Sequence, residues 1–519
     1  MTPPRVGRRE WIGLAVIALP CLLYSMDLTV LNLAIPKLSA DLQPSAAELL
    51  WIVDIYGFLV AGSLITMGAL GDRIGRRRLL LIGAAAFGVA SVLAAFSTSA
   101  WMLIAARAVL GLAGATLAPS TLSLIRNMFH DPQQRTVAIS VWVMSYSAGA
   151  AIGPPLGGIL LQHFWWGSVF LVSVPVMVLL LVLGPLLLPE YKDPESRRLD
   201  LFSAALSLAC VLPVIYGLKE IAQDGLAWLP ALCIATGLAI GAAFVHRQRL
   251  LADPLIDLRL FRAPAFSASL AVYGLGTFAV FGVYVFTAQY LQLVLGLSPL
   301  AAGLWSVPFS GGFIVGSIVT PLIARRVRPA FVMAVGLGVA AIGFGLLAQI
   351  GTGSGRLGLL VTSTVIFSLG LAPLFTLAND LIVGNAPPQR AGAAAAISET
   401  CSEFGGALGI AVLGSIGTAL YRSAMADAVP SGLSPETTEA ARSTLGGAVA
   451  AAGQLAEPLG GTLLGTARQA FTQSLQMTAA TSAVVAIVLA TIALVMLRHV
   501  RPAAREEQPG PEPEAFVAG

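Results

Sequence analysis

Charged residues are scarce in this chain of 519 residues, since Asp, Glu, Lys and Arg together make up only 11% of it. Typical soluble domains carry about 25% charged residues. Hydrophobic residues reach 57%, and the mean hydropathy is +0.84. This composition excludes a soluble globular protein. It predicts an all-α membrane protein in which each apolar stretch of ~20 residues crosses the bilayer.

Cysteine and familiar enzyme motifs are scarce or missing as well. The four cysteines all lie in apolar windows and lack metal-ligand spacing, so we expect neither a disulfide framework nor a metal site. The chain has no GxxxxGK[ST] loop for nucleotide phosphates, no HExxH and no GxSxG context for a catalytic triad. An ATP-driven pump and a membrane enzyme are therefore disfavoured, and we expect no cofactor.

Fourteen apolar windows are long enough to span a bilayer. Their approximate cores are 11–31, 48–70, 79–97, 101–125, 136–160, 166–188, 201–218, 228–246, 265–292, 300–323, 331–350, 358–383, 391–420 and 476–498. Of the 30 Lys and Arg residues, 23 fall on one side of the membrane and six on the other, with Arg107 inside the fourth span. The positive-inside rule then places both termini in the cytoplasm of a bacterial inner or plasma membrane protein. The net charge of +4 follows from this topology and gives no reason to expect nucleic acid.

An internal repeat divides the chain. "DPQQRTVAIS" aligns with "APPQRAGAAA" at an offset of 255 residues, and a second pair of segments aligns at an offset near 254. This offset of about 255 residues corresponds to eight spans. Because the chain has fourteen spans, it indicates two six-helix bundles separated by an inserted helix pair, which we expect to face lipid. The predicted units are a first bundle at 1–192, the inserted pair with its flanking loops at 193–262, a second bundle at 263–498 with a long extracytoplasmic loop at 421–475, and a disordered cytoplasmic tail at 499–519. Two related bundles predict a binding site between them, near the bilayer midplane.

Several motifs then occur in order on the expected spans. They are "SMDLTVLNLAIP" (25–36), "LLWIVDIYG" (49–57), "GALGDRIGRRRLLLIG" (68–83), "RAVLGLAGA" (107–115) and "GAAIGPPLGG" (149–158). Together with the fourteen spans, they resemble the major facilitator superfamily, and most closely its drug/proton antiporters that expel quaternary ammonium compounds and dyes. The resemblance covers residues 10–498.

The resemblance implies the major facilitator fold and proton-coupled efflux of lipophilic cations and dyes by alternating access. The proton would be the coupling ion, the ligands would be hydrophobic cations, and we expect a monomer in the lipid bilayer. A dedicated exporter of one endogenous antibiotic or metabolite is an alternative that the same scaffold supports. An uptake symporter is a further alternative, which the motif at 149–158 disfavours. A non-transporting membrane sensor or enzyme is the alternative of a different class.

The loop after the second span is a candidate gate. Its candidate residues are Gly68, Gly71, Asp72, Arg73, Gly75 and Arg76. The glycines allow close approach of helices, and Asp72 is placed to cap a helix or to pair with an arginine of a neighbouring loop. A merely topogenic basic loop explains the arginines but not Asp72.

The stretch "GAAIGPPLGG" would be costly in a soluble helix, because each proline deletes a backbone hydrogen bond. Inside a membrane bundle, neighbouring helices satisfy the freed groups and glycines form a smooth face for tight packing. We expect a kinked, closely packed seam made by Gly149, Gly153, Pro154, Pro155, Gly157 and Gly158. A simple small-residue interface is the alternative, and antiport is implied by the resemblance alone.

Ionisable residues inside spans are functional candidates by default. They are Asp27, Asp54, Arg107, Glu399 and Glu403. Glu399 and Glu403 are spaced i, i+4, so they share a helix face. If that face meets the central cavity, desolvation and mutual repulsion favour proton uptake. A structural role, in which the glutamates pair with polar groups for packing, is the alternative. Asp27 and Asp54 resemble family positions whose carboxylates take part in proton coupling or cation binding. We assign coupling and cation binding to Asp27 and Glu399, with Asp54 and Glu403 in support. Arg107 either assists proton transfer or closes a structural ion pair with Asp27.

A hydrophobic cation also favours aromatic faces. Candidate cavity aromatics are Tyr56, Trp142, Tyr146, Tyr284 and Trp305.

Overall fold

The computed structural model describes residues 7–129, 131–192, 200–224, 227–251, 254, 256, 258–353, 355–384, 391–426, 429 and 434–500. Over these ranges the chain is helical and contains no strand. Fourteen of its helices are long and apolar enough to cross a membrane, which confirms the predicted all-α fold with fourteen spans. The tail predicted to be disordered lies almost wholly outside the described residues.

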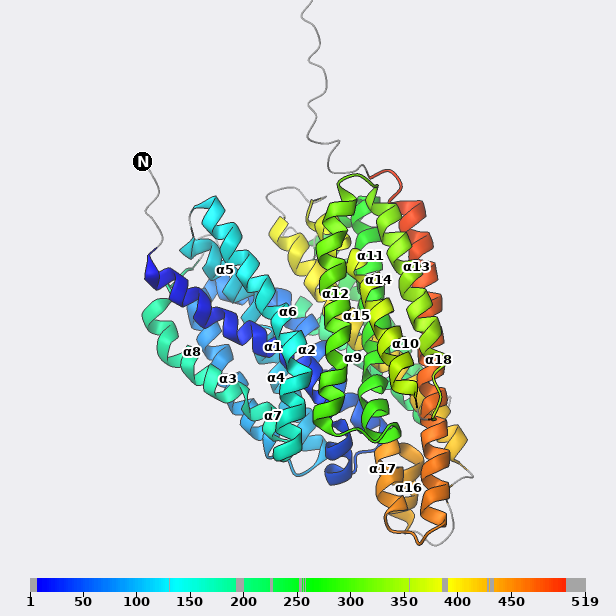
Figure 1. The fold of residues 1–519 in the computed structure, drawn as a ribbon. Coiled ribbons are helices and arrows are strands. Elements are labelled where there is room, and N and C mark those ends of the chain that lie inside the picture. The colour runs from blue at the N-terminus through cyan, green and yellow to red at the C-terminus, as the bar shows by residue number, and fades with distance from the viewer. Residues whose placement is uncertain are drawn as a thin grey trace, which may run out of the picture.

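The helices of the first half form one bundle, drawn blue to cyan on the left of Figure 1. They are α1 (Arg8–Leu42), α2 (Ala46–Ile74), α3 (Arg76–Ala95), α4 (Ala100–Gly114), α5 (Leu117–Met128), α6 (Pro132–His163), α7 (Ser168–Leu171) and α8 (Ser173–Leu187). Helices α4 and α5 together make one span. The start of α2 is fixed by a capping box between Ser45 and Glu48, which satisfies free backbone N–H groups of the first turn.

The second bundle lies on the right of Figure 1, in green to red. It consists of α11 (Pro264–Gln289) with the π-helix η2 (Tyr290–Val294), α12 (Pro299–Ala324), α13 (Pro329–Leu347), α14 (Arg356–Gly384), α15 (Ala391–Met425) and α18 (Leu459–Met496); the short 3-10 helix η1 (Leu260–Arg262) precedes it. Ser298 caps α12 and Pro299 occupies its first turn, a typical helix start.

The long extracytoplasmic loop is shorter than predicted and partly helical. Residues 421–425 belong to α15 and residues 459–475 to α18, because polar residues in these stretches continue the helices beyond the apolar windows. Between them lie α16 (Pro435–Ser443) and α17 (Leu445–Ala452).

Contacts between the bundles gather at the end opposite the N-terminus, which the charge count assigns to the extracytoplasmic face. A Cβ on Gly303 of α12 would lie 2.2 Å from the carbonyl oxygen of Pro154 on α6, so the two backbones touch. Gln292 of η2 donates a hydrogen bond to the carbonyl of Leu33 on α1 at 2.9 Å. The bundles are therefore closed on the extracytoplasmic side.

The inserted pair consists of α9 (Leu201–Asp224) and α10 (Trp228–Leu250). The prediction that it merely faces lipid is wrong for α9. Ile215 of α9 is 1% exposed and packs in one cluster with Phe58 of α2 and Ala407 of α15. Helix α9 thus covers the line along which α2 and α15 meet, because its apolar face packs against side chains of these two helices instead of lipid.

Candidate functional site

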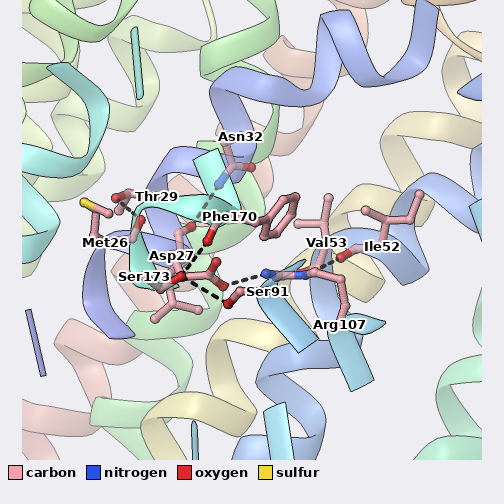
Figure 2. Close-up of polar contacts among 11 residues, drawn as sticks. Met26, Asp27, Thr29, Asn32, Ile52, Val53, Ser91, Arg107, Phe170 and Ser173 are labelled. Carbon is pink, nitrogen blue, oxygen red and sulfur yellow. Dashed lines mark hydrogen bonds and ion pairs between the residues drawn. The ribbon is translucent and has the colours of Figure 1, made fainter. Parts of the chain in front are cut away.

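Asp27 and Arg107 form a buried ion pair within the first bundle. Arg107 on α4 is 1% exposed, and its Nη1 lies 2.5 Å from Oδ2 of Asp27 on α1. Its Nε and Nη2 donate to the carbonyl oxygens of Ile52 and Val53 on α2, at 3.0 and 3.3 Å. Figure 2 shows the guanidinium between Asp27 on one side and these two carbonyls on the other. Of the two roles expected for Arg107, the ion pair with Asp27 is the one formed in this conformation.

This arrangement is stable for an elementary reason. A buried charge is tolerated only when it is paired and its donors are satisfied. Arg107 meets both conditions, and its guanidinium carbon also lies 4.8 Å from the centroid of the Tyr56 ring. The arginine therefore ties α1, α2 and α4 together around one carboxylate.

Asp54 on α2 is fully buried and has a partner that the sequence analysis missed. The Lys219 ammonium on α9 lies 2.9 Å from Oδ1 and 2.8 Å from Oδ2 of Asp54. Lys219 also lies 3.8 Å from the centroid of the Trp51 ring. The predicted span at 201–218 stops just before Lys219, so the charge count includes Lys219 among the six residues on the extracytoplasmic side. In the structure α9 continues to Asp224, and Lys219 lies within this helix.

Glu399 and Glu403 lie on α15, and Glu403 faces the first bundle. The hydroxyl of Tyr24 on α1 donates a hydrogen bond to Oε1 of Glu403 at 2.6 Å. The ion pairs found among the described residues include neither glutamate. These two carboxyl groups therefore differ from Asp27 and Asp54, each of which has a basic partner.

A small cavity lies between the bundles at this level. Its volume is about 60 Å³, and Asp54 and Glu403 both line it, together with Thr277, Phe281 and Ser402 of the second bundle. Drug-sized pockets measure roughly 300–1,000 Å³. In this conformation the cavity has room for water but not for a drug-sized ligand.

Three of the predicted aromatic residues meet beside the glutamates. Ring centroids are 4.9 Å apart for Trp142 and Tyr146, 5.8 Å for Tyr146 and Tyr24, and 6.0 Å for Tyr24 and Tyr56. We call Tyr24, Tyr56, Trp142 and Tyr146 the aromatic cluster. Tyr24 was missed, because a single tyrosine in an apolar helix gives no signal of its own.

The other two predicted aromatics are placed differently. Tyr284 packs on Phe309, with centroids 6.3 Å apart, inside the second bundle. Trp305 on α12 is 43% exposed. The structure therefore does not bring these two into the aromatic cluster.

The predicted gate loop folds around its own ion pair. Arg76 Nη2 lies 2.5 Å from Oδ1 of Asp72, and Arg76 Nη1 donates to the carbonyl of Pro119 on α5 at 3.2 Å. Gly75 has φ +111°, a conformation that favours glycine, and it is the residue that caps α3. Among the described residues, Asp72 pairs with Arg76 of the same loop, and neither a helix cap nor an arginine of a neighbouring loop is found at its carboxylate.

The two glycines Gly68 and Gly71 of the gate loop lie close to neighbouring side chains. A Cβ on Gly71 would lie 2.9 Å from the Arg76 side chain, and one on Gly68 would lie 3.7 Å from Pro119. Arg73 is exposed.

The motif at 149–158 packs against two helices at once. Added Cβ atoms on Gly149, Gly153 and Gly157 would strike Leu22, Thr29 and Val30 of α1, at 2.1, 2.2 and 2.8 Å. A Cβ on Gly158 would lie 2.6 Å from the carbonyl of Pro299 on α12, and Pro154 touches Gly303 of the same helix. The close packing expected of this motif is therefore present, and it lies against the segment of α1 that carries Asp27.

Larger hollows lie beside the inserted pair. One of about 720 Å³ is lined by residues of α9 and α10 together with Phe404 and Leu408 of α15. Its lining is largely apolar, as expected for a surface within the membrane.

The helical architecture and the buried carboxylates at the boundary of two bundles define the class of a multi-span membrane transporter. The sequence profile of the Major Facilitator Superfamily matches residues 17–410 of the chain. The chain belongs to the major facilitator superfamily.

Relatives and solved structures agree with this assignment. The chain is 44% identical over 495 residues to the multidrug efflux pump LfrA of Mycolicibacterium smegmatis, covering 95% of this chain and 98% of that protein. It is 36% identical to the methyl viologen resistance protein SmvA of Salmonella typhimurium, covering 89% and 93%. It is 32% identical to the tetracenomycin C resistance and export protein of Streptomyces glaucescens, covering 98% and 96%.

A solved structure similar in fold is that of a bacterial homologue of the human lysosomal transporter Spinster in an inward-facing, unoccupied conformation. The TM-score is 0.67 at 16% identity, and the match covers 98% of this chain and 100% of that one. The likeness concerns the fold alone.

Proposed function

We propose that this chain exports lipophilic cations, including quaternary ammonium compounds and dyes, in exchange for protons. The observation that carries the proposal is the position of the aromatic cluster, between the Asp27–Arg107 pair and Glu403 at the boundary of the bundles. Aromatic faces and carboxylates are the groups that attract an organic cation. Relatives named for multidrug efflux and methyl viologen resistance support the same substrate class.

The transport cycle follows from competition for a carboxyl group. A proton from outside neutralises a carboxylate of the site, which weakens its hold on the cation and releases the cation outward. Release of the proton to the cytoplasm restores the negative charge, and the next cation binds. Coupling arises because one carboxylate does not hold both ligands at once.

The hydrogen bond between Tyr24 and Glu403 gives this competition a structural consequence. It joins the two bundles in the conformation closed on the extracytoplasmic side. A cation at Glu403 competes with Tyr24 for the same carboxylate. Substrate binding thereby loosens one contact between the bundles, which favours their rearrangement.

The transporter acts as a monomer in the bacterial inner or plasma membrane, with the proton as its coupling ion and no other cofactor. Glu399, Asp27, Asp54 and Glu403 share the proton and cation binding, with Asp27 and Glu399 in the leading roles.

A dedicated exporter of one antibiotic or metabolite is the second candidate. The relative named for resistance to and export of tetracenomycin C supports it, because it matches 98% of this chain. The two candidates share the fold and differ in the breadth of their substrates.

The experiment is a fluorescence assay of the pH gradient in inverted membrane vesicles. Ethidium or a quaternary ammonium compound is added to vesicles with the wild type or with the double variant Asp27→Asn, Glu399→Gln. We expect the gradient to collapse with the wild type alone. Collapse with both proteins would overturn the assignment of these carboxylates, whereas no response to any cation would favour the dedicated exporter.

A further inference from the structure

Lys219 comes from the inserted helix α9, yet its ammonium group reaches into the region of the carboxylates. Its side chain is 1% exposed and that of Asp54 is 0% exposed. The ammonium contacts both oxygens of Asp54 and lies over the Trp51 ring. A carboxylate and an aromatic face are the groups that would hold an organic cation, and here the protein's own cation occupies them.

Asp54 lies between Lys219 and the small cavity. The same carboxyl group that binds Lys219 lines the cavity opposite Glu403 of the second bundle. A cation in the cavity therefore experiences both Asp54 and the neighbouring positive charge of Lys219. Because Arg107 neutralises Asp27 in the same way, Lys219 removes a further unit of negative charge from the surroundings of the site.

The packing of α9 holds this charge in place. Ile215, one turn before Lys219, is buried between the two bundles with Phe58 and Ala407. Nearer the N-terminal end of α9, the Leu208 side chain fills the space beside Gly62 of α2. Lys219 is thus anchored by its helix, and its ammonium does not depend on a flexible loop.

We propose that Lys219 is a tethered counter-ion of Asp54 that determines the charge selectivity of the site, disfavouring dications relative to monocations of the same shape. The inference rests on the proposed function, since it presupposes that organic cations bind at this site. It gives the inserted helix pair a part in substrate selection.

The size of the effect follows from Coulomb's law. At a separation of roughly 6 Å and an effective dielectric constant of ~40, between the values for a protein surface and for bulk water, removing one positive charge strengthens binding of a monocation on the order of tenfold. A dication carries twice the charge, so its affinity increases on the order of a hundredfold. The ratio of the two affinities therefore changes about tenfold in favour of the dication.

The experiment uses two flat ligands of nearly equal shape, the monocation 1-methyl-4-phenylpyridinium and the dication methyl viologen. Their dissociation constants are measured by titration calorimetry on the purified full-length chain. We compare the wild type with Lys219→Met, Lys219→Arg and the double variant Lys219→Met, Asp54→Asn. The arginine variant keeps the charge, and the double variant removes both charges.

We expect Lys219→Met to shift the affinity ratio toward the dication and the other two variants to keep the ratio of the wild type. An unchanged ratio in Lys219→Met, or the same shift in the double variant, would overturn the inference. If Lys219→Met aggregates, Asp54→Asn supplies the test, because its unpaired Lys219 should shift the ratio about tenfold against the dication. Failure of the wild type to bind either ligand would instead contradict the proposed function.

Discussion

The Tyr24 hydroxyl donates a hydrogen bond of 2.6 Å to Glu403, and this bond crosses from one six-helix bundle to the other. Both residues belong to long helices that are apolar enough to span the membrane, α1 and α15. On the proposed mechanism, the relative position of these two helices changes during transport. A hydrogen bond to a charged group contributes roughly 1.5–3 kcal/mol. On the proposed mechanism, the pair therefore connects occupancy of one carboxyl group to the closure of the bundles.

Replacing Tyr24 with Phe tests this connection. We expect transport of tetraphenylphosphonium in inverted vesicles to fall about tenfold, because a charge-assisted hydrogen bond of this size is lost. The matched control is Tyr421→Phe, since the Tyr421 hydroxyl donates to the carbonyl of Ala441 without reaching the first bundle. Strictly additive effects of Tyr24→Phe and Glu403→Gln would contradict a functional link between the two residues.

The Asp27–Arg107 pair gives a second prediction. Asp27→Asn leaves the buried Arg107 without its counter-charge, a change that costs about 3–5 kcal/mol for buried pairs. We expect both lower thermal stability and loss of substrate-induced proton flux. Asp41→Asn on the same helix is the control, because Asp41 accepts a hydrogen bond from Trp166 and has no part in the proposed coupling. Normal proton flux in Asp27→Asn would remove Asp27 from the mechanism.

The contact between Gly303 and Pro154 predicts a conformational defect. Gly303→Val places a side chain where a Cβ alone comes within 2.2 Å of the Pro154 carbonyl, so α6 and α12 are forced apart. We expect transport to fall at least about tenfold, with increased maleimide labelling from outside at a cysteine introduced for Leu33.

Gly311 provides the control for that experiment. It lies on α12 as well, and a Cβ there would have no atom within 4 Å. Gly311→Val should therefore keep both transport and the low labelling of the wild type. Equal labelling in the two variants would show that the seam is not what closes the extracytoplasmic side.

A pH-dependent prediction concerns Asp200, just before the membrane-spanning part of α9. Burial acts to raise the pKa of Asp200, but hydrogen bonds from Ser203 and Arg247 outweigh it and hold this pKa below its ordinary value of 3.8. A lowered pKa in the folded state means that the stabilisation is present above pH 3.8 and is lost as the pH falls through the folded pKa.

We therefore expect the wild type to unfold at a higher temperature than Asp200→Asn at neutral pH. The difference should disappear under acidic conditions, as followed by tryptophan fluorescence in detergent. A difference that is independent of pH would mean that the contacts of Asp200 with Arg247 contribute no linked stability.

The spans could be predicted because lipid allows few solutions to backbone hydrogen bonding. A long apolar run must form a helix, whatever its neighbours are. The glycines at 149–158 were also predictable as a packing surface, since small residues are what allow helices to touch in a membrane. In both cases the information lies in one continuous stretch of sequence.

The partners of the buried charges could not be predicted in the same way. Lys219 pairs with Asp54 over 165 residues of sequence, and Tyr24 pairs with Glu403 over 379. Such pairs depend on which helix faces cross, and a single sequence does not specify this. The exposed position of Trp305 has the same origin, because its rotation on α12 follows from the contacts of Gly303 with α6.

Helices α16 and α17 hold the outer ends of both bundles. The Arg422 guanidinium of α15 lies 3.4 Å from Glu439 of α16, and a Cβ on Gly446 of α17 would lie 2.9 Å from Ser39 of α1. Any opening toward the outside must separate this segment from α1. An antibody or other macromolecule that fixes α17 against α1 would thus prevent this opening from the extracytoplasmic side, without entering the membrane.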